Sequence, residues 1–332
     1  MSKNKRAKQS ATTLIDKTKR LLEEKGTEPL KTAKKMVSEE KVVSGKLHEA
    51  LQYFMNQYWH DLTTPTLISL ACEAVGGNAS TVKPIAVPMI LISGAIDIHD
   101  DVIDKSKEKD GKATVFGKFG KETALIAGDF LLVEGFTSLT NALKTVSCEK
   151  HKQIVTIVRR SLFELAEAES LELSLKAKGL SKPDEHLSVI HKKAADVEGL
   201  MMIGAVLGEG SSREVAALGK YGRCLGMLSI LKDELLDTID EKEFSHRIRY
   251  ESLPITVLYT FQNMASNSKE LFLSSLQEKN AKELCKMIEK HGGFVRCREA
   301  MRETANECYA AIKSIKYNKK ELILLIDYLT FT

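Results

Sequence analysis

Residues 84–104, PIAVPMILISGAIDIHDDVID, join a long apolar run to a dense cluster of acids. The two prolines stand near the start, where a helix tolerates proline. The apolar body predicts a buried helix, and the aspartates fall at its C-terminal end. Acids at that end oppose the helix dipole, which favours cations there. A bound cation would explain the arrangement, so we expect one.

The rest of the chain also predicts helices. It has 332 residues, 43% hydrophobic and 28% charged, with only 6 prolines and 20 glycines. Apolar residues recur every three or four positions, and no run alternates as a strand does. No composition break marks a linker. We therefore expect an all-α, single-domain helical bundle over residues 13–332, after a basic N-terminal segment, residues 1–12, that we expect to be disordered.

Charge and cysteine usage exclude several classes of protein. A net charge of +4 is too small to argue for nucleic acid. The six cysteines are scattered and form no CxxC pair. This pattern is typical of a protein in a reducing cytoplasm, and it argues against a disulfide framework and against a zinc site. The N-terminus lacks the apolar segment of a signal peptide. The longest apolar runs look too short to span a bilayer. We expect a cytoplasmic protein with no nucleic-acid partner and no transmembrane segment.

The aspartates of the opening stretch form what we call the first acidic group: Asp97, Asp100, Asp101 and Asp104. Asp100 and Asp104 are four residues apart, and Asp101 and Asp104 are three apart, so a helix places them on one face. Crowded carboxylates repel unless a cation lies between them. Hard oxygen ligands on few residues suit Mg²⁺, which completes its shell with water and substrate phosphates. The alternative is a solvated, salt-bridged helix end.

A second acidic group follows another apolar segment, in LSILKDELLDTIDEKE at residues 228–243. We define it as Asp233, Asp237 and Glu241, which are spaced four residues apart on one expected helix. Two such helices facing each other in a bundle would make one negatively walled cavity. Chemistry that needs this cavity holds a diphosphate through Mg²⁺ ions and stabilises it as it leaves.

Five stretches, in order along the chain, make it resemble a known enzyme family. They are PTLISLACEAVGG at 65–77, IHDDVID at 98–104, KFGKETALIAGDFLL at 118–132, GRCLGMLSILKDELLDTID at 222–240 and HGGFVRCREAMRETANECY at 291–309. The second and fourth resemble the two aspartate-rich motifs of the trans-isoprenyl diphosphate synthases, also called polyprenyl synthetases. The resemblance implies a helical bundle around a deep central cavity, the isoprenoid synthase fold, usually in dimers.

The resemblance also implies a cofactor, Mg²⁺, and a substrate, an allylic prenyl diphosphate. The residues expected to hold the metal are Asp100, Asp101, Asp104, Asp233, Asp237 and Glu241. The expected catalytic residues are Asp100, Asp101, Asp104 and Lys193. Those expected to contact the substrate are Lys109, Lys193, Ala95, Ile96 and Glu169, with Ala95 and Ile96 near the floor of its pocket.

The chain departs from the family mainly where the second substrate, isopentenyl diphosphate, binds through cationic side chains. Asp61 and Thr64 stand where a lysine and an arginine are expected. Ser93 replaces a histidine, and Asp110 replaces an arginine. A diphosphate loses its hydration when it enters a binding site, so the site must supply cationic hydrogen-bond donors in its place. Lysines of the 105–121 loop either replace the missing charge or are solvated surface groups. Within the second motif, Glu234 replaces an aspartate.

Three functional readings remain. The first is a prenyltransferase that elongates an allylic diphosphate. The second is a terpene-synthase-like enzyme that works without isopentenyl diphosphate, because the second acidic group also fits the metal-binding spacing of that class. The third is a non-catalytic subunit of a heteromeric synthase. Intact metal motifs argue against the third, since a structural subunit does not need them. A homodimer or a heteromer with a related synthase is expected.

Overall fold

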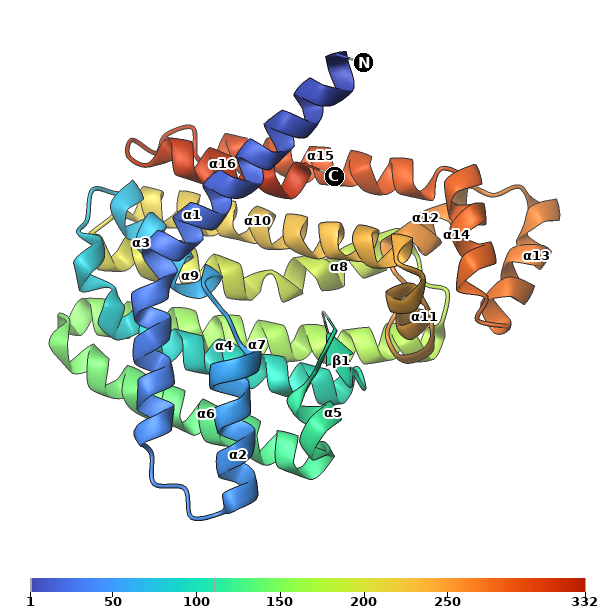
Figure 1. Cartoon of the computed structure of the whole chain (residues 1–332). Coiled ribbons are helices and arrows are strands. Elements are labelled where there is room, and N and C mark those ends of the chain that lie inside the picture. Colours follow the sequence, from blue (N-terminus) through green and yellow to red (C-terminus); the bar gives the residue numbers. More distant parts are fainter. Residues whose placement is uncertain (1, 110, 332) are drawn as a thin grey trace. The chain divides into compact units, whose positions relative to one another are not determined.

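The computed structural model confirms the predicted all-α class (Figure 1). It describes residues 2–109 and 111–331, with side chains from residue 12 onward. The chain divides into two compact units that alternate along the sequence. Residues 2–155, 203–212 and 316–321 form the first unit, and residues 156–202, 213–315 and 322–331 form the second. The single domain expected over residues 13–332 stays a prediction.

The first unit contains the N-terminal helices and the first acidic group. Its elements are α1 (Ser2–Glu39), α2 (Gly45–Tyr53), the π-helix η1 (Phe54–Tyr58), α3 (Thr63–Ala74), η2 (Ala79–Thr81), α4 (Lys83–Ile103), β1 (Glu108–Lys109), β2 (Lys112–Ala113), α5 (Val115–Phe119), α6 (Lys121–Ala142) and η3 (Leu143–Thr145). Residues 2–12, for which we expected disorder, are the first turns of α1. Their disorder in solution stays a prediction.

The second unit holds the second acidic group. Its elements, some of which begin or end in the first unit, are α7 (Cys148–Lys178), α8 (Pro183–Lys193), α9 (Ala195–Leu207), α10 (Ser212–Ile239), α11 (Glu241–Tyr250), α12 (Ile255–Asn263), α13 (Ser266–Gln277), α14 (Ala281–Lys290), α15 (Gly293–Ala311) and α16 (Lys319–Thr330). Helix α12 packs against α8, α14 and α15.

Helices α4 and α6 pack along each other and form the centre of the first unit (Figure 1). Two glycines on α6, seven residues apart, allow this close approach. A Cβ added at Gly128 would lie 2.4 Å from Nε2 of His99, and one at Gly135 would lie 2.7 Å from Cγ1 of Ile92. The apolar body of α4 is therefore buried, as predicted, and its acidic end is held against α6.

The apolar helix α6 could also cross a membrane by length and composition alone, over residues 121–145. In the first unit, 33% of its most apolar stretch is buried. Core helices of soluble proteins reach the same length and hydropathy, but they are mostly buried. The expectation of no transmembrane segment therefore stays a prediction.

Two short strands that the sequence analysis did not predict follow α4. Strands β1 and β2 pair antiparallel, with Lys109 opposite Lys112. Gly111, in the connection, has φ +72°, a conformation that suits glycine. Tyr53 also donates a hydrogen bond from its hydroxyl to the carbonyl oxygen of Ala113, at 2.6 Å. The hairpin turns the chain back toward the end of α4, and this places Lys109.

Candidate active site

The first acidic group gathers around a basic side chain at the end of α4. The Nζ atom of Lys109 lies 2.7 Å from Oδ1 of Asp101, 3.7 Å from Oδ1 of Asp97 and 3.9 Å from Oδ2 of Asp100. Asp101 is buried, with its side chain 1% exposed. Asp104 follows the last helical residue, and its backbone N–H bonds the carbonyl oxygen of Asp100. The structure thus brings together Asp97, Asp100 and Asp101, with Lys109 among them.

Burial and mutual repulsion make the carboxylates of Asp97 and Asp101 costly to ionise. Burial raises the pKa of Asp101 to about 7; the Lys109 ammonium opposes this rise, and the Asp97 carboxylate adds to it. For Lys109, burial opposes the charge, but Asp97, Asp101 and Asp100 outweigh it and raise its pKa. Lys109 is therefore a permanent cation that partly neutralises the first acidic group.

Asp61 has a local structural role that its sequence position did not reveal. Its Oδ1 accepts hydrogen bonds from the backbone N–H groups of Thr63 and Thr64, both at 2.9 Å, at the start of α3. Such N–H groups otherwise offer a site for an anion. Burial is the main cause that raises the pKa of Asp97, and the nearby Asp61 carboxylate adds to that rise. Burial raises the pKa of Asp61 itself, and the hydrogen bonds from Thr64 and Thr63 oppose that rise. Asp61 therefore occupies this helix end with its own side-chain oxygen.

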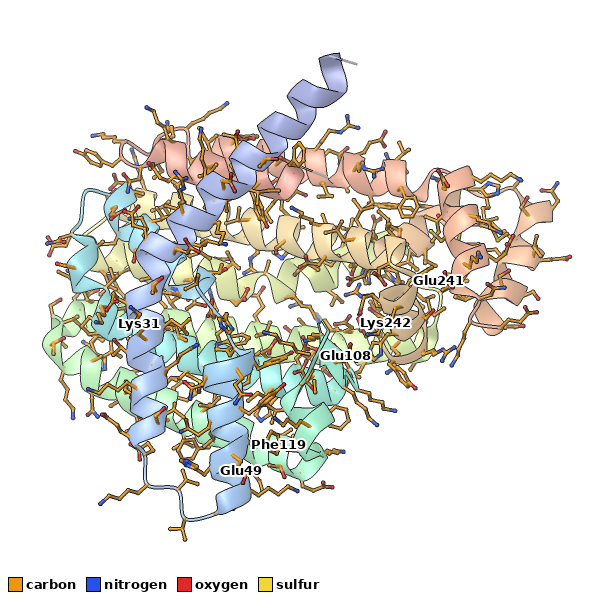
Figure 2. All side chains as sticks on the ribbon, in the orientation of Figure 1. Lys31, Glu49, Glu108, Phe119, Glu241 and Lys242 are labelled. Carbon is orange, nitrogen blue, oxygen red and sulfur yellow. The ribbon has the colours of Figure 1, made fainter. Side chains whose placement is uncertain are left out.

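In the second acidic group, Asp233 and Asp237 lie on α10 as predicted, but Glu241 does not. Helix α10 ends at Ile239, and Asp240 has extended backbone angles of φ −78° and ψ 115°. Its side chain accepts hydrogen bonds from the N–H groups of Lys242 and Glu243 and so caps α11. Glu241 is an exposed residue at the start of that next helix (Figure 2). The expectation that all three acids share one helix was therefore wrong.

Asp233 is an exposed residue near the end of α10. Partial desolvation of its carboxyl by the surrounding chain raises its pKa to about 6, the Asp237 carboxylate adds to the rise, and the Arg247 guanidinium opposes it. A carboxylate that is this costly to ionise gains from a nearby cation.

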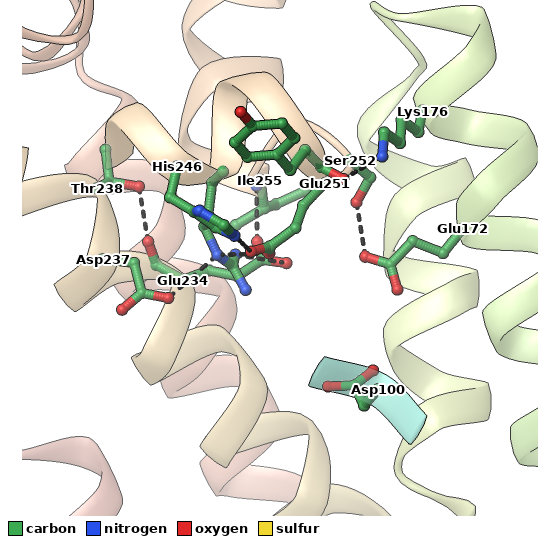
Figure 3. A network of polar contacts seen from close by, with 12 residues as sticks. Asp100, Glu172, Lys176, Glu234, Asp237, Thr238, His246, Glu251, Ser252 and Ile255 are labelled. Carbon is green, nitrogen blue, oxygen red and sulfur yellow. Dashed lines mark hydrogen bonds and ion pairs between the residues drawn. The ribbon is translucent and has the colours of Figure 1, made fainter. Parts of the chain in front are cut away.

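Glu234, the departure within the second motif, is turned into the interior of the second unit. It accepts a hydrogen bond at 2.8 Å from Nε2 of His186. It accepts another at 2.7 Å from the N–H of Ile255, which Figure 3 shows. Burial opposes its charge, but His186, Arg247 and the Ile255 N–H together lower the pKa of Glu234 to about 2. This glutamate is a buried anion held by its neighbours.

Lys193 ends α8 and is held by acids from α7. Its Nζ lies 3.0 Å from Oε1 of Glu169 and also pairs with Glu172. Glu172 accepts a hydrogen bond from Oγ of Ser252, at 2.8 Å. The structure thus joins Lys193 and Glu169, both predicted site residues, to Glu172.

The donor chemistry at the end of α4 suits Mg²⁺. Both carboxylate oxygens of Asp101 are buried without a well-oriented hydrogen bond, and the approach of Lys109 is an ion pair. In the described part of the chain, no three His, Cys, Asp or Glu side chains enclose a metal position by themselves. Mg²⁺ does not need such a cage, because it is usually bound by one or two carboxylates, waters and substrate phosphates. Asp100, Asp101 and Asp104 are therefore candidate ligands.

Comparison with known proteins supplies the family. The sequence pattern of the polyprenyl synthetases matches residues 46–290. The chain belongs to the polyprenyl synthetase family. A short chain isoprenyl diphosphate synthase of Methanothermobacter thermautotrophicus is 27% identical over 69% of this chain and 72% of its own length. A heterodimeric geranylgeranyl pyrophosphate synthase large subunit of Arabidopsis thaliana is 35% identical over 58% of this chain and 54% of its own.

Solved structures of this family share the fold. A decaprenyl diphosphate synthase from Rhodobacter capsulatus superposes with a TM-score of 0.82 at 20% identity, over 94% of this chain and 98% of its own. A geranylgeranyl pyrophosphate synthetase from Pyrococcus horikoshii has a TM-score of 0.72 at 24% identity, over 98% of this chain and 97% of its own. The predicted family and fold are therefore confirmed, and the chain is an enzyme of the polyprenyl synthetase family.

The two residues expected at the pocket floor differ in exposure. Ala95 is fully buried and belongs to the same hydrophobic cluster of the first unit as Phe54 and Leu91, whereas Ile96 is partly exposed. Their place in a prenyl pocket stays a prediction. Both are smaller than phenylalanine, so this polyprenyl synthetase is expected to admit a long chain past them.

We expect Ala95→Phe to shorten the longest prenyl chain accepted, as a cutoff and not a gradual decline, because a steric clash costs more than the contact of a methylene or two. The measurement is the length distribution of substrates consumed and products formed from a series of allylic diphosphates. Overpacking is also expected to cost about 1–3 kcal/mol of stability. Ala127→Phe, at another fully buried alanine of the same core, is the control. Unchanged lengths in Ala95→Phe would place the floor elsewhere.

Proposed function

We propose that this polyprenyl synthetase is an Mg²⁺-dependent enzyme that ionises an allylic prenyl diphosphate and transfers the prenyl group. The observation that carries the proposal is the gathering of Asp97, Asp100 and Asp101 at the end of one buried helix, with buried carboxylate oxygens directed at a cationic group. Crowded, desolvated carboxylates of this kind favour a bound cation.

The roles follow from the chemistry of each side chain. Asp100, Asp101 and Asp104 would hold Mg²⁺ in the first unit, and Asp233, Asp237 and Glu241 would hold it in the second. Bound Mg²⁺ stabilises the charge that develops on a departing diphosphate. Lys109 and Lys193 would bind oxygens of the diphosphate. To do so, Lys109 would exchange its ion pair with Asp101, and Lys193 its ion pair with Glu169, for the diphosphate.

Two alternatives for the acceptor step remain within the proposal. Asp61 already places a carboxylate on the N–H groups of α3 and is unsuited to bind a second diphosphate. This observation favours an enzyme that acts without isopentenyl diphosphate, in the manner of a terpene synthase. A subunit of a heteromeric synthase is the other alternative, and one relative named above is the large subunit of a heterodimer. We propose a cytoplasmic protein that acts as a homodimer or in such a heteromer.

One incubation separates these possibilities. The purified protein is mixed with Mg²⁺ and allylic diphosphates of several lengths, with and without isopentenyl diphosphate, and products are identified by mass spectrometry. Longer diphosphates formed only with isopentenyl diphosphate would establish chain elongation. Hydrocarbons or alcohols with free diphosphate would establish a terpene-synthase-like reaction. No turnover, with activity restored by a related synthase, would establish the subunit role. A chelator should abolish any of these reactions.

A further inference from the structure

Glu234 lies next to Asp233 in sequence but points away from the second acidic group. Its side chain is 4% exposed, and its two oxygens have separate partners. Oε1 lies 2.8 Å from Nε2 of His186 on α8, and Oε2 accepts the N–H of Ile255 at the start of α12. Because both oxygens are engaged inside the second unit, Glu234 is in a poor position to be a metal ligand.

The guanidinium of Arg247, on α11, links Glu234 to the second acidic group. Its Nε lies 3.1 Å from Oδ2 of Asp237 and 3.1 Å from Oε2 of Glu251, and its Nη1 lies 3.7 Å from Oε1 of Glu234. Figure 3 labels the three carboxylates that this guanidinium contacts, those of Glu234, Asp237 and Glu251. The planar guanidinium can bridge several carboxylates at once, which a lysine ammonium cannot do with the same geometry.

We propose that Glu234 and Arg247 are positioning residues that orient Asp237 for the metal. Glu234, fixed by His186 and Ile255, anchors Arg247, and Arg247 in turn holds one oxygen of Asp237. This inference rests on the proposed function, in which Asp237 binds Mg²⁺. Hydrogen-bonded partners of metal-binding carboxylates commonly change metal affinity about 10–100-fold when they are altered.

The length of the Glu234 side chain allows it to reach both His186 and Ile255. Aspartate, the family residue at this position, is one methylene shorter. From the backbone position of residue 234, it would not reach both His186 and Ile255 without a shift of α10. Glu234→Asp keeps the charge and restores the family's DDxxD pattern, yet we expect it to weaken metal binding. A role of Glu234 through charge alone, or as a metal ligand, makes the opposite prediction.

The test measures Mn²⁺ binding to the full-length protein in the presence of inorganic diphosphate, by electron paramagnetic resonance, with no turnover needed. We expect Glu234→Asp and Glu234→Gln to weaken binding about 10–100-fold. Arg247→Lys keeps the positive charge but cannot contact several carboxylates at once, so it should weaken Mn²⁺ binding by a similar factor. This variant replaces the Glu234 variants in the test if those do not fold. Glu164→Gln is the matched control, because it breaks another partly buried pair with an arginine, Arg223, in the same unit. It should lower the melting temperature without weakening Mn²⁺ binding.

The outcomes separate this inference from the proposed function. If the wild type binds Mn²⁺ and Asp233→Asn weakens binding, the second acidic group is a metal site. Wild-type affinity in Glu234→Asp and Arg247→Lys would then overturn the positioning role alone. Equal weakening by Glu164→Gln would also overturn it, since general destabilisation would explain the loss. Absence of Mn²⁺ binding in the wild type would overturn the positioning role together with the proposed metal site.

Discussion

Asp100→Asn and Asp104→Asn are each expected to remove most turnover of any allylic diphosphate while the fold persists. A metal ion supplies several kcal/mol of stabilisation to the leaving group, and about 1.4 kcal/mol corresponds to tenfold in rate. A lost ligand should therefore lower the rate by about a hundredfold or more. Steady-state rates at saturating Mg²⁺ measure the loss of turnover, and circular dichroism measures whether the fold persists.

An exposed aspartate of the same unit provides the control. Asp16, on α1, is exposed. Asp16→Asn removes one negative charge without touching the first acidic group, so its rate should stay near that of the wild type. If Asp100→Asn and Asp104→Asn also kept near-wild-type rates at saturating Mg²⁺, the first acidic group would not be the metal site.

The second large effect concerns isopentenyl diphosphate, which this protein alone is expected to bind weakly. Asp61, Thr64, Ser93 and Asp110 stand at positions where the family pattern has cationic side chains. Each lost charge-assisted hydrogen bond costs about 1.5–3 kcal/mol. Three or four such losses weaken binding by several powers of ten, at about 1.4 kcal/mol per tenfold. Lysines of the 105–121 segment, which contains β1, β2 and α5, would recover part of this loss.

Calorimetry of the isolated protein tests the expectation, and an allylic diphosphate with Mg²⁺ is the positive control. Micromolar binding of isopentenyl diphosphate without metal would refute the loss of this site and support ordinary chain elongation. Weak binding that tightens only with a partner synthase would support the subunit role. Weak binding together with metal-dependent release of diphosphate from the allylic substrate would support a terpene-synthase-like reaction.

The sequence by itself determined the fold class and the family of this protein. Apolar residues at helical spacing predict helices because each amphipathic face must be buried, and α4 and α10 lie where that spacing placed them. The first acidic group was visible because its members are close in sequence. The β1–β2 hairpin was missed, although an Asp-Gly pair at residues 110–111 is a known hairpin signal.

Only the tertiary structure decided which charges meet. The hairpin brings Lys109 to Asp101, Asp240 caps α11 and removes Glu241 from α10, and Glu234 turns inward to His186. Periodicity reports which face of a helix is buried, but it carries no information about the partner across that face. A helix end such as that after Ile239 depends on one side chain competing for backbone N–H groups. A hydrogen bond between residues 48 positions apart, such as His186 and Glu234, forms only when packing brings their helices together.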